Sequence, residues 1–195
     1  SMDICAIENG VVCYERPVDT PEIAKRPEVI IEAIEAALPL DLIAAPSGYG
    51  VEITPIGDIS EKNFRDWYYN YILLTTRKEI EGAVKKGVFG ALLYYAMTES
   101  TLIMKKKSWP LVFIPGVVNL STVPRHRKIN KLDMGTADKM SVSILGVYDQ
   151  SRELGISYSK TSFILVEMGF GYNAVIGVEK GRIIDGIGGT TIAAP

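Results

Sequence analysis

The first β-type pattern lies at the start of the sequence, in residues 3–14. Two short, mainly apolar runs flank Asn9-Gly10, and Asn-Gly suits a type I′ turn because both central residues of that turn need φ > 0. This segment therefore predicts a hairpin with Glu8 opposite Val11. The same register places Ala6 opposite Cys13 and Cys5 opposite Tyr14, which puts the two cysteines on opposite faces.

A second β-type pattern occupies residues 163–185. It predicts an apolar strand, a glycine loop, a second strand, a Lys180-Gly181 turn and a third strand. Aligning this turn with Asn9-Gly10 makes the apolar positions of both hairpins coincide, so the sequence predicts an internal duplication. The later copy has a strand and a glycine loop ahead of its hairpin. We therefore expect a comparable strand to precede residue 1.

Between the hairpins, helical and strand-like patterns alternate, which predicts an α/β fold with a mixed sheet. Helices are expected over residues 27–38, 61–71, 79–104 and 136–153, with an interruption near Gly87 and Gly90. The aromatic stripe of the second helix and an inner face of the last helix are expected in the core. The stripe comprises Phe64, Trp67, Tyr68 and Tyr71, and the inner face comprises Met140, Ile144, Val147 and Tyr148. Buried strands are expected over residues 41–46 and 111–115.

Composition narrows the class of protein. The 195 residues are 47% hydrophobic and 23% charged with a formal net charge of −2, which excludes a disordered chain and disfavours a nucleic-acid binder. No apolar run reaches the length of a membrane span, and no secretory signal is visible. Two cysteines and one histidine are too few for finger-type zinc sites. We expect a cytoplasmic protein with two free, buried thiols and no nucleic-acid or membrane partner.

Residues 167–173 form the first group of residues with candidate chemistry. Glu167 ends an apolar strand, Gly169 and Gly171 allow close backbone approach to a ligand, and Asn173 adds an amide. Exposed backbone N–H groups in such a loop can bind a phosphate, and a neighbouring carboxylate can hold Mg²⁺ directly or through water. The segment predicts a phosphate site with Glu167 at the metal. A plain surface turn is the alternative.

Residues 124–136 form the second group. Arg125, His126 and the two following cations precede the expected start of a helix at Gly135-Thr136. Such a cluster can bind a carboxylate substrate and stabilise charge on a phosphoryl group in transfer. Asp133 and Asp138 are candidate bases or metal partners. A solvated basic loop is the alternative.

The strand, glycine loop, strand, turn and strand pattern, present twice, resembles the phosphate motifs of the actin-like ATPase superfamily, which includes sugar, acetate and butyrate kinases. Residues 133–139 and 167–190 look like those of a mostly archaeal family of predicted butyrate kinases. The resemblance implies the first half of an actin-like fold with a ribonuclease-H-like sheet flanked by helices. It assigns residues 1–160 to a first domain lacking its first strand, and 161–195 to the start of a second copy.

The resemblance also implies ATP and Mg²⁺ as cofactors. Ser1 matches the last residue of a first phosphate loop, and Gly135, Thr136, Gly169, Gly171 and Asn173 fall in nucleotide-binding positions. Glu167 stands where carboxylate kinases carry a histidine, so phosphoryl transfer is better supported than butyrate as the acceptor. If one loop is cut and the other half is absent, these 195 residues alone should be inactive.

Three functions are compatible with these patterns. The preferred one is an ATP-dependent phosphotransferase acting on a small acceptor such as a carboxylate, with Arg125, His126 and Asp133 as catalytic residues. The second is a nucleotide-binding regulatory or ATPase module. The third is a metal nuclease using Asp3, Glu167 and Asp185, which the acidic charge balance disfavours. A homodimer is left open.

Overall fold

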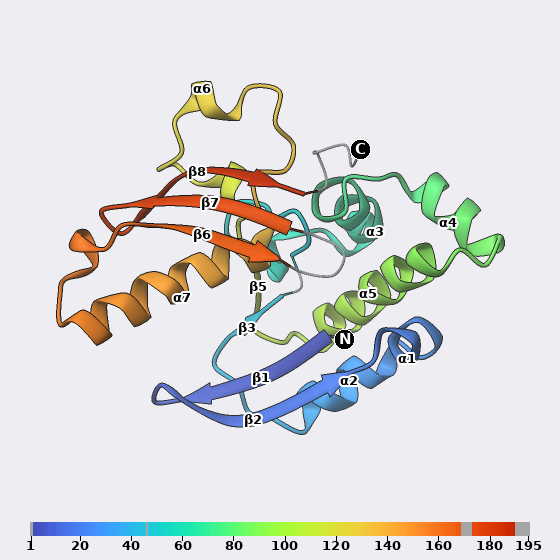
Figure 1. Cartoon of the computed structure of the whole chain (residues 1–195). Coiled ribbons are helices and arrows are strands. Elements are labelled where there is room, and N and C mark those ends of the chain that lie inside the picture. Colours follow the sequence, from blue (N-terminus) through green and yellow to red (C-terminus); the bar gives the residue numbers. More distant parts are fainter. Residues whose placement is uncertain (1, 46, 169–172, 190–195) are drawn as a thin grey trace. The chain divides into compact units, whose positions relative to one another are not determined.

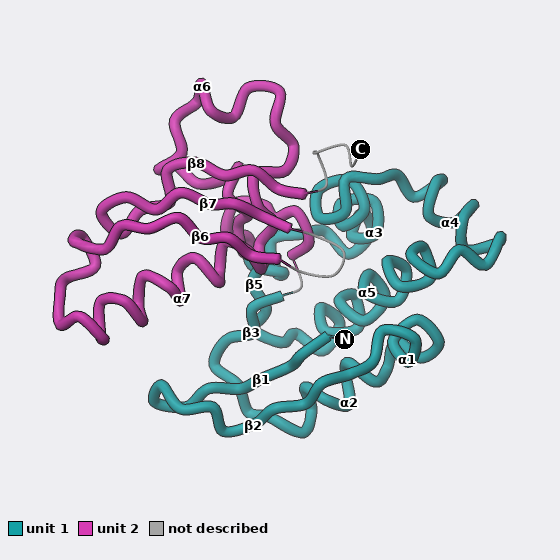
Figure 2. The backbone as a smooth tube through the Cα atoms, in the orientation of Figure 1, with its two compact units in different colours: residues 1–46, 55–112 teal, residues 47–54, 113–195 magenta. Residues whose placement is uncertain are grey.

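The computed structural model describes residues 2–45, 47–168 and 173–189 (Figure 1). The chain divides into two compact units, coloured separately in Figure 2. Unit 1 contains Ser1–Pro46 and Pro55–Val112, and unit 2 contains Ser47–Thr54 and Phe113–Pro195. The predicted boundary at residue 160 marks the start of a second repeat copy, whereas the two units are defined by compact packing. That boundary therefore stays a prediction.

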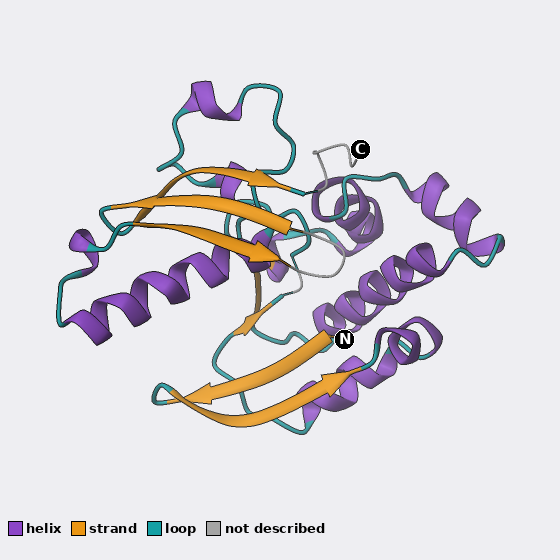
Figure 3. Ribbon diagram, in the orientation of Figure 1, coloured by secondary structure: helices purple, strands orange, loops and turns teal. Residues whose placement is uncertain are grey.

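Helices and strands alternate along the chain, which confirms a mixed α/β fold (Figure 3). Unit 1 holds β1 (Met2–Glu8), β2 (Val11–Val18), α1 (Thr20–Lys25), α2 (Glu28–Glu35), β3 (Ile43–Ala44), η1 (Ile56–Asp58), η2 (Glu61–Asn63), α3 (Phe64–Trp67), η3 (Tyr68–Ile72), α4 (Arg77–Lys85), α5 (Phe89–Lys106) and most of β5 (Leu111–Phe113). Unit 2 holds η4 (Val117–Asn119), α6 (Arg125–Lys128), α7 (Ala137–Leu154), η5 (Tyr158–Lys160), β6 (Phe163–Met168), β7 (Asn173–Glu179) and β8 (Arg182–Gly188). The short β4 (Thr54–Pro55) lies where the chain passes between the units.

The described strands form three sheets rather than the one mixed sheet we predicted. β1 and β2 pair antiparallel, β3 pairs parallel with β5, and β6, β7 and β8 form an antiparallel sheet in that order. β3 and β4 contribute only two residues each. Strands of two residues are shorter than is usual in proteins and form only a few ladder hydrogen bonds.

The first hairpin has the predicted turn but not the whole predicted register. Asn9 and Gly10 have φ of 52° and 79°, and Glu8 pairs with Val11. A β-bulge between Ala6 and Ile7 then shifts the pairing, so that Ala6 faces Tyr14 and not Cys13. One extra residue on the second strand causes this shift, which alternation of apolar residues does not reveal.

The cysteines of this hairpin are free, as predicted, but both are exposed. The prediction of buried thiols is therefore wrong. Only Ala6 and Val18 of the two strands are buried, because β1 and β2 form a two-stranded sheet without a third strand among the described residues. The Cys13 thiol lies in the bulge and donates to the Ala6 carbonyl at 3.4 Å.

The second hairpin repeats the first closely. Lys180 and Gly181 have φ of 52° and 72°, and its register shift falls between Gly177 and Val178. In the alignment of the two turns, these residues coincide with Ala6 and Ile7. The two hairpins therefore share a turn and a bulge at the same aligned position.

The helix with the aromatic stripe departs from the prediction. Phe64 and Tyr68 are fully buried, but Tyr71 is 58% exposed. The segment runs through α3 into the π-helix η3, whose wider turns change the angle between successive side chains. Tyr69 and Ile72 enter the core instead of Tyr71.

The remaining helices largely follow the sequence pattern. α2 starts after Pro27, and α4 and α5 are separated near Gly87 as predicted. Lys105 and Lys106 lie in the last turn of α5, where positive charges favour the helix dipole. The sequence also carries a helix that we missed, α1, which has Asp19 at its N-cap and a proline in its first turn.

α7 has the predicted bounds within one or two residues and packs along one face of the sheet of β6, β7 and β8 (Figure 1). Met140 and Val147 are buried, whereas Ile144 and Tyr148 are exposed, contrary to prediction. The buried stripe runs instead through Ala137, Met140, Ser143 and Val147. α7 comes close to the sheet at Gly146, where an added Cβ would lie 3.0 Å from the Phe163 ring.

Candidate functional site

Several predicted site residues meet at one end of the sheet in unit 2. β6 ends there, β7 begins there, β8 ends there, and α7 begins beneath them (Figure 1). We call this group the sheet-end site, and it consists of residues 133–139 with Glu167, Asn173 and Gly188. Antiparallel pairing explains the convergence, because the end of one strand always lies beside the start of the next.

Asp133 is only 4% exposed and acts within the protein as an anchor for its own loop. Its Oδ1 accepts a hydrogen bond from the Gly135 N–H at 2.8 Å, and its carbonyl accepts from the Gly188 N–H at 3.2 Å. A Cβ on Gly188 would lie 1.9 Å from Asp133 Oδ1, so the carboxylate rests directly on this glycine. No pattern in the sequence indicated that Gly188 belongs to the site. The catalytic role of Asp133 stays a prediction.

Gly135 connects this loop to the core of unit 2. Its φ of 123° lies in a region that favours glycine, and its carbonyl accepts from the Val117 N–H at 2.9 Å. An added Cβ would come within 2.9 Å of Ile176 Cδ1. A side chain here would therefore displace the loop that leads into α7. Nucleotide binding by Gly135 stays a prediction.

Thr136 is the N-cap residue of α7, as predicted, but its side chain makes no cap hydrogen bond. Its hydroxyl donates instead to the Asp138 carboxylate. Burial raises the pKa of Asp138, but the Thr136 hydroxyl, Lys139 and a backbone N–H outweigh burial and leave the pKa below its ordinary value. Asp138 is therefore ionised at neutral pH in the first turn of α7, where the helix dipole favours a negative charge.

Glu167 forms an ion pair that the sequence analysis missed. Lys139 Nζ lies 2.8 Å from Glu167 Oε2 and 3.0 Å from Asp138 Oδ2. Burial lowers the pKa of Lys139, but the two carboxylates outweigh burial and raise the pKa above its ordinary value. The alternation of β6 carried a signal for this pair. Glu167 shares the inward parity of Phe163 and Leu165, and an inward carboxylate requires a cation from the helix that covers it.

The residues around Glu167 do not fit a direct Mg²⁺ ligand set in this structure. Its buried oxygen already faces the Lys139 ammonium. Within residues 2–45, 47–168 and 173–189, no group of three or more His, Cys, Asp or Glu side chains could hold a metal ion. Mg²⁺ needs free oxygen ligands, which a carboxylate paired with an ammonium does not offer.

The basic cluster of residues 125–131 contacts β8 at Asp185, in the middle of the strand and not at its end. Arg127 and Lys131 form ion pairs with Asp185 at 3.2 and 3.4 Å. Arg125 and His126, in the short α6, are exposed. Asp133, in contrast, is buried. A joint catalytic role of Arg125, His126 and Asp133 stays a prediction.

The other predicted binding residues divide into two groups. Asn173 is exposed, and its carbonyl accepts from the Gly189 N–H at 2.7 Å, which holds the start of β7 beside the end of β8. Ser1, Gly169 and Gly171 lie outside the described residues. The carboxylates proposed for the nuclease alternative include Glu167 and Asp185, and both are paired with cations.

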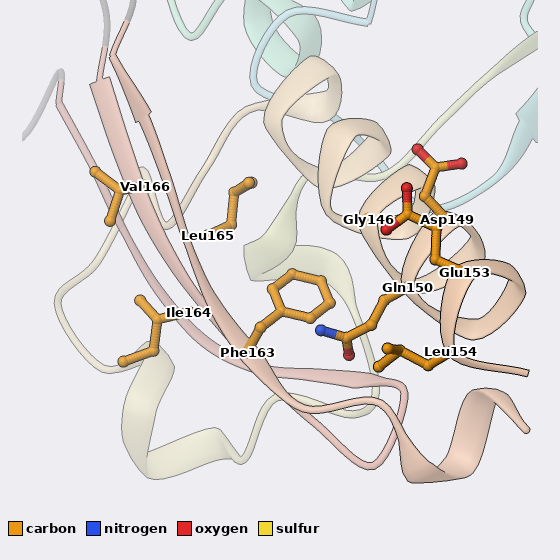
Figure 4. Close-up of a pocket in the computed structure, with 9 residues that line it drawn as sticks. All are labelled: Gly146, Asp149, Gln150, Glu153, Leu154, Phe163, Ile164, Leu165 and Val166. Carbon is orange, nitrogen blue, oxygen red and sulfur yellow. The ribbon is translucent and has the colours of Figure 1, made fainter. Parts of the chain in front are cut away.

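An open groove lies between α7 and β6, also within unit 2 (Figure 4). Asp149, Gln150 and Glu153 reach it from the helix, and Phe163 and Leu165 reach it from the strand. None of the predicted site residues lines this groove. In the described ranges, no helix combines the length and the apolar character needed to cross a membrane.

Comparison with known proteins identifies the family. Residues 1–195 match the family described as "Protein of unknown function (DUF1464)", and the chain belongs to this family. No curated protein matches the sequence.

Among solved structures, the crystal structure of acetate kinase from Entamoeba histolytica is similar to this chain, with a TM-score of 0.45 and 14% sequence identity. The similarity covers 91% of this chain and 44% of that chain. This chain therefore spans less than half the length of the acetate kinase that it matches.

Proposed function

We propose that this protein is part of an ATP-dependent phosphotransferase that acts on a small acceptor. The observation that carries the proposal is the repeated hairpin, in which β1–β2 and β7–β8 share a turn with two positive φ angles and a bulge at the same aligned position. A repeated strand-turn-strand unit is part of the sequence pattern that resembles the phosphate motifs of the actin-like superfamily. The finer fold assignment, the first half of an actin-like fold with a ribonuclease-H-like sheet, belongs to this proposal.

In this proposal, the loop between β6 and β7, together with Ser1, binds the phosphates of ATP. Supporting this role, Glu167 and Asn173 stand on either side of the loop at the ends of paired strands. Mg²⁺ enters the proposal only as the counter-ion of the nucleotide, since Glu167 is paired with Lys139. A nucleotide and a small molecule are the proposed partners, and a cytoplasmic location goes with them.

The acceptor is proposed to bind near the exposed cations Arg125 and His126. A guanidinium can bind a carboxylate with two hydrogen bonds, which suits an acid as the acceptor. In the reaction, a carboxylate oxygen of the acceptor attacks the γ-phosphorus of ATP, and the bond to the β–γ bridging oxygen breaks. The products are an acyl phosphate and ADP. Butyrate is one acid to test.

Titration calorimetry of the full-length protein with Mg-ATP tests the proposal. We expect saturable binding, and weaker binding to a variant in which the strand ends are altered, Asn173→Ala. The control is Gln150→Ala, which changes an amide on the groove side of α7. Absence of binding at about millimolar nucleotide, which corresponds to a binding free energy of only about −4 kcal/mol, would contradict the proposal.

A nucleotide-binding regulatory or ATPase module is the second candidate. Asp133 accepts a backbone hydrogen bond and Glu167 is paired with Lys139. Carboxylates engaged in this way are less suited to act as a catalytic base or a metal ligand, which favours a module without kinase activity. Measuring ADP release with and without short-chain acids separates the two candidates. A kinase releases ADP only when an acceptor is present, whereas a module is indifferent to the acid. Arg125→Gln should weaken the acid dependence, and Arg152→Gln in α7 serves as its control.

A further inference from the structure

Two carboxylates from different elements converge on the Lys139 ammonium. Asp138 belongs to the first turn of α7, and Glu167 belongs to the end of β6. Lys139 Nζ lies 3.0 Å from Asp138 Oδ2 and 2.8 Å from Glu167 Oε2. The Lys139 side chain is only 12% exposed and that of Glu167 is 26% exposed, whereas that of Asp138 is 65% exposed. The Lys139 side chain is therefore largely buried, between one mostly buried carboxylate and one exposed carboxylate.

Lys139 supplies the positive charge that balances the Glu167 carboxylate. Its Oε2 atom is buried, and among the described residues no hydrogen-bond donor reaches it with good geometry. Asp138 has a second partner in Thr136, whereas the ion pair with Lys139 is the charge contact found for Glu167. Two carboxylates that share one ammonium must lie close to each other, and they repel unless a cation stands between them.

The same arrangement without the ammonium has the composition of a small divalent-cation site. Mg²⁺ in proteins is commonly held by one or two carboxylates together with several water molecules. The two oxygens that face Lys139 come from separate elements and point to a common position. A positive charge of the protein itself fills that position.

We propose that the Lys139 ammonium is a built-in cation that occupies a divalent-cation position between Asp138 and Glu167. The protein without nucleotide therefore binds no Mg²⁺ at Glu167, and loss of the ammonium opens this position to a metal ion. The inference rests on the proposed function only in taking Glu167 as a carboxylate of the nucleotide site. It concerns the metal alone and is tested without nucleotide.

The experiment measures Mn²⁺ binding to the full-length protein by electron paramagnetic resonance of the free ion. Mn²⁺ serves as the probe for a hard divalent cation. We expect Lys139→Met to bind one Mn²⁺ at least about tenfold more tightly than the wild type, because an unbalanced carboxylate pair attracts a cation. The gain should disappear in Lys139→Met/Glu167→Gln. If Lys139→Met binds no more tightly, the inference is overturned.

Two control variants test whether tighter Mn²⁺ binding requires loss of the positive charge at residue 139. Lys139→Arg keeps the positive charge and should bind Mn²⁺ as weakly as the wild type. Lys107→Met removes another lysine from an ion pair, with Glu35 at 2.8 Å, and should also leave Mn²⁺ binding unchanged. A similar gain in Lys107→Met would show a general effect of net charge and overturn the inference.

A further variant tests the inference even if Lys139→Met does not fold. Glu167→Gln alone keeps the lysine, so Mn²⁺ affinity should stay within about twofold of the wild type, a difference well under 1 kcal/mol. Weaker Mn²⁺ binding in Glu167→Gln would mean that Glu167 already holds a metal, contrary to the inference. Mg-ATP binding is measured separately, so failure of the proposed function and failure of this inference give different results.

Discussion

The two hairpins have the same backbone design but different surroundings. Each has a two-residue turn with positive φ angles, and each has a register shift at the same aligned position. In β7–β8 the residues Ile176, Val178 and Ile183 are buried in the core of unit 2, in a sheet that β6 extends and α7 covers. In β1–β2 the aligned residues Cys5, Ile7 and Val12 are exposed.

This difference shows which properties of a hairpin are local. The turn and the bulge recur where the sequence pattern recurs, because φ preferences and the register are set by neighbouring residues. Burial does not recur, because it depends on a third strand and a covering helix. Only Ala6 and Val18 of β1–β2 are buried, so this hairpin contributes little apolar burial to unit 1.

The largest expected effect comes from truncating aligned apolar residues. Ile183 is 2% exposed, whereas its counterpart Val12 is 55% exposed. We expect Ile183→Ala to lower the free energy of unfolding by about 2 to 5 kcal/mol, and Val12→Ala to change it by less than about 0.5 kcal/mol. Urea denaturation followed by circular dichroism measures both. Equal losses at the two positions would show that β1–β2 is covered in solution, and that the two hairpins do not differ in burial.

The turn glycines give the next largest difference. Gly10 and Gly181 both have φ near 75°, but a Cβ on Gly10 meets nothing within 4 Å, whereas a Cβ on Gly181 would lie 2.4 Å from the Tyr158 carbonyl oxygen. Gly10→Ala should cost only about 1 kcal/mol for its left-handed backbone. Gly181→Ala should cost about 1 to 3 kcal/mol more, because the loop at Tyr158 must move. Thermal unfolding of the two variants tests this, and equal costs would argue against the close contact.

A smaller effect is expected at Asp185, which has no counterpart in the first hairpin because Tyr14 takes its place. Asp185→Asn removes the ion pairs with Arg127 and Lys131. These three side chains are 30 to 56% exposed, so the loss should stay below about 1 kcal/mol.

The salt dependence of this loss identifies its origin. At about 1 M salt, where the Debye length is about 3 Å, wild type and Asp185→Asn should unfold at nearly the same urea concentration. Glu179→Gln, an exposed carboxylate of the same hairpin, is the control and should have little effect at either salt concentration. A loss at Asp185 that persists in high salt would point to packing instead of charge.

The smallest energetic effect concerns the exposed thiols. Cys5 and Cys13 should both react with a thiol reagent in the folded protein, at rates close to those in the unfolded protein, and with little loss of stability. Isotope-coded alkylation followed by mass spectrometry measures each site separately. Slow labelling of both thiols would show that the first hairpin is buried like the second.

The sequence was sufficient for features that depend on neighbouring residues. Asn9-Gly10 and Lys180-Gly181 predicted both turns, Thr136 predicted the start of α7, and the break at Gly87 separated two helices. α1 could have been predicted as well, from the proline in its first turn after Asp19. The prediction of an α/β fold followed from these elements.

Other features depend on contacts between distant residues or on small changes of helical geometry. The π-helical turns of η3 exposed Tyr71, although a regular helix would place it beside Tyr68. The ion pair of Lys139 with Glu167 joins residues 28 positions apart, and only the inward parity of Glu167 hinted at it. The closeness of Asp133 to Gly188 left no periodic signal at all.

Within unit 2, Gly50 and Gly116 lie back to back. A Cβ on Gly50 would fall 1.9 Å from the Gly116 nitrogen, and a Cβ on Gly116 would fall 2.1 Å from the Tyr49 carbonyl oxygen. Neither position can accept a methyl group while the other segment stays where it is, and changing both at once only adds a second methyl to the same space. A side chain at either of these positions, which lie 66 residues apart in the sequence, therefore requires the two backbone segments to move apart.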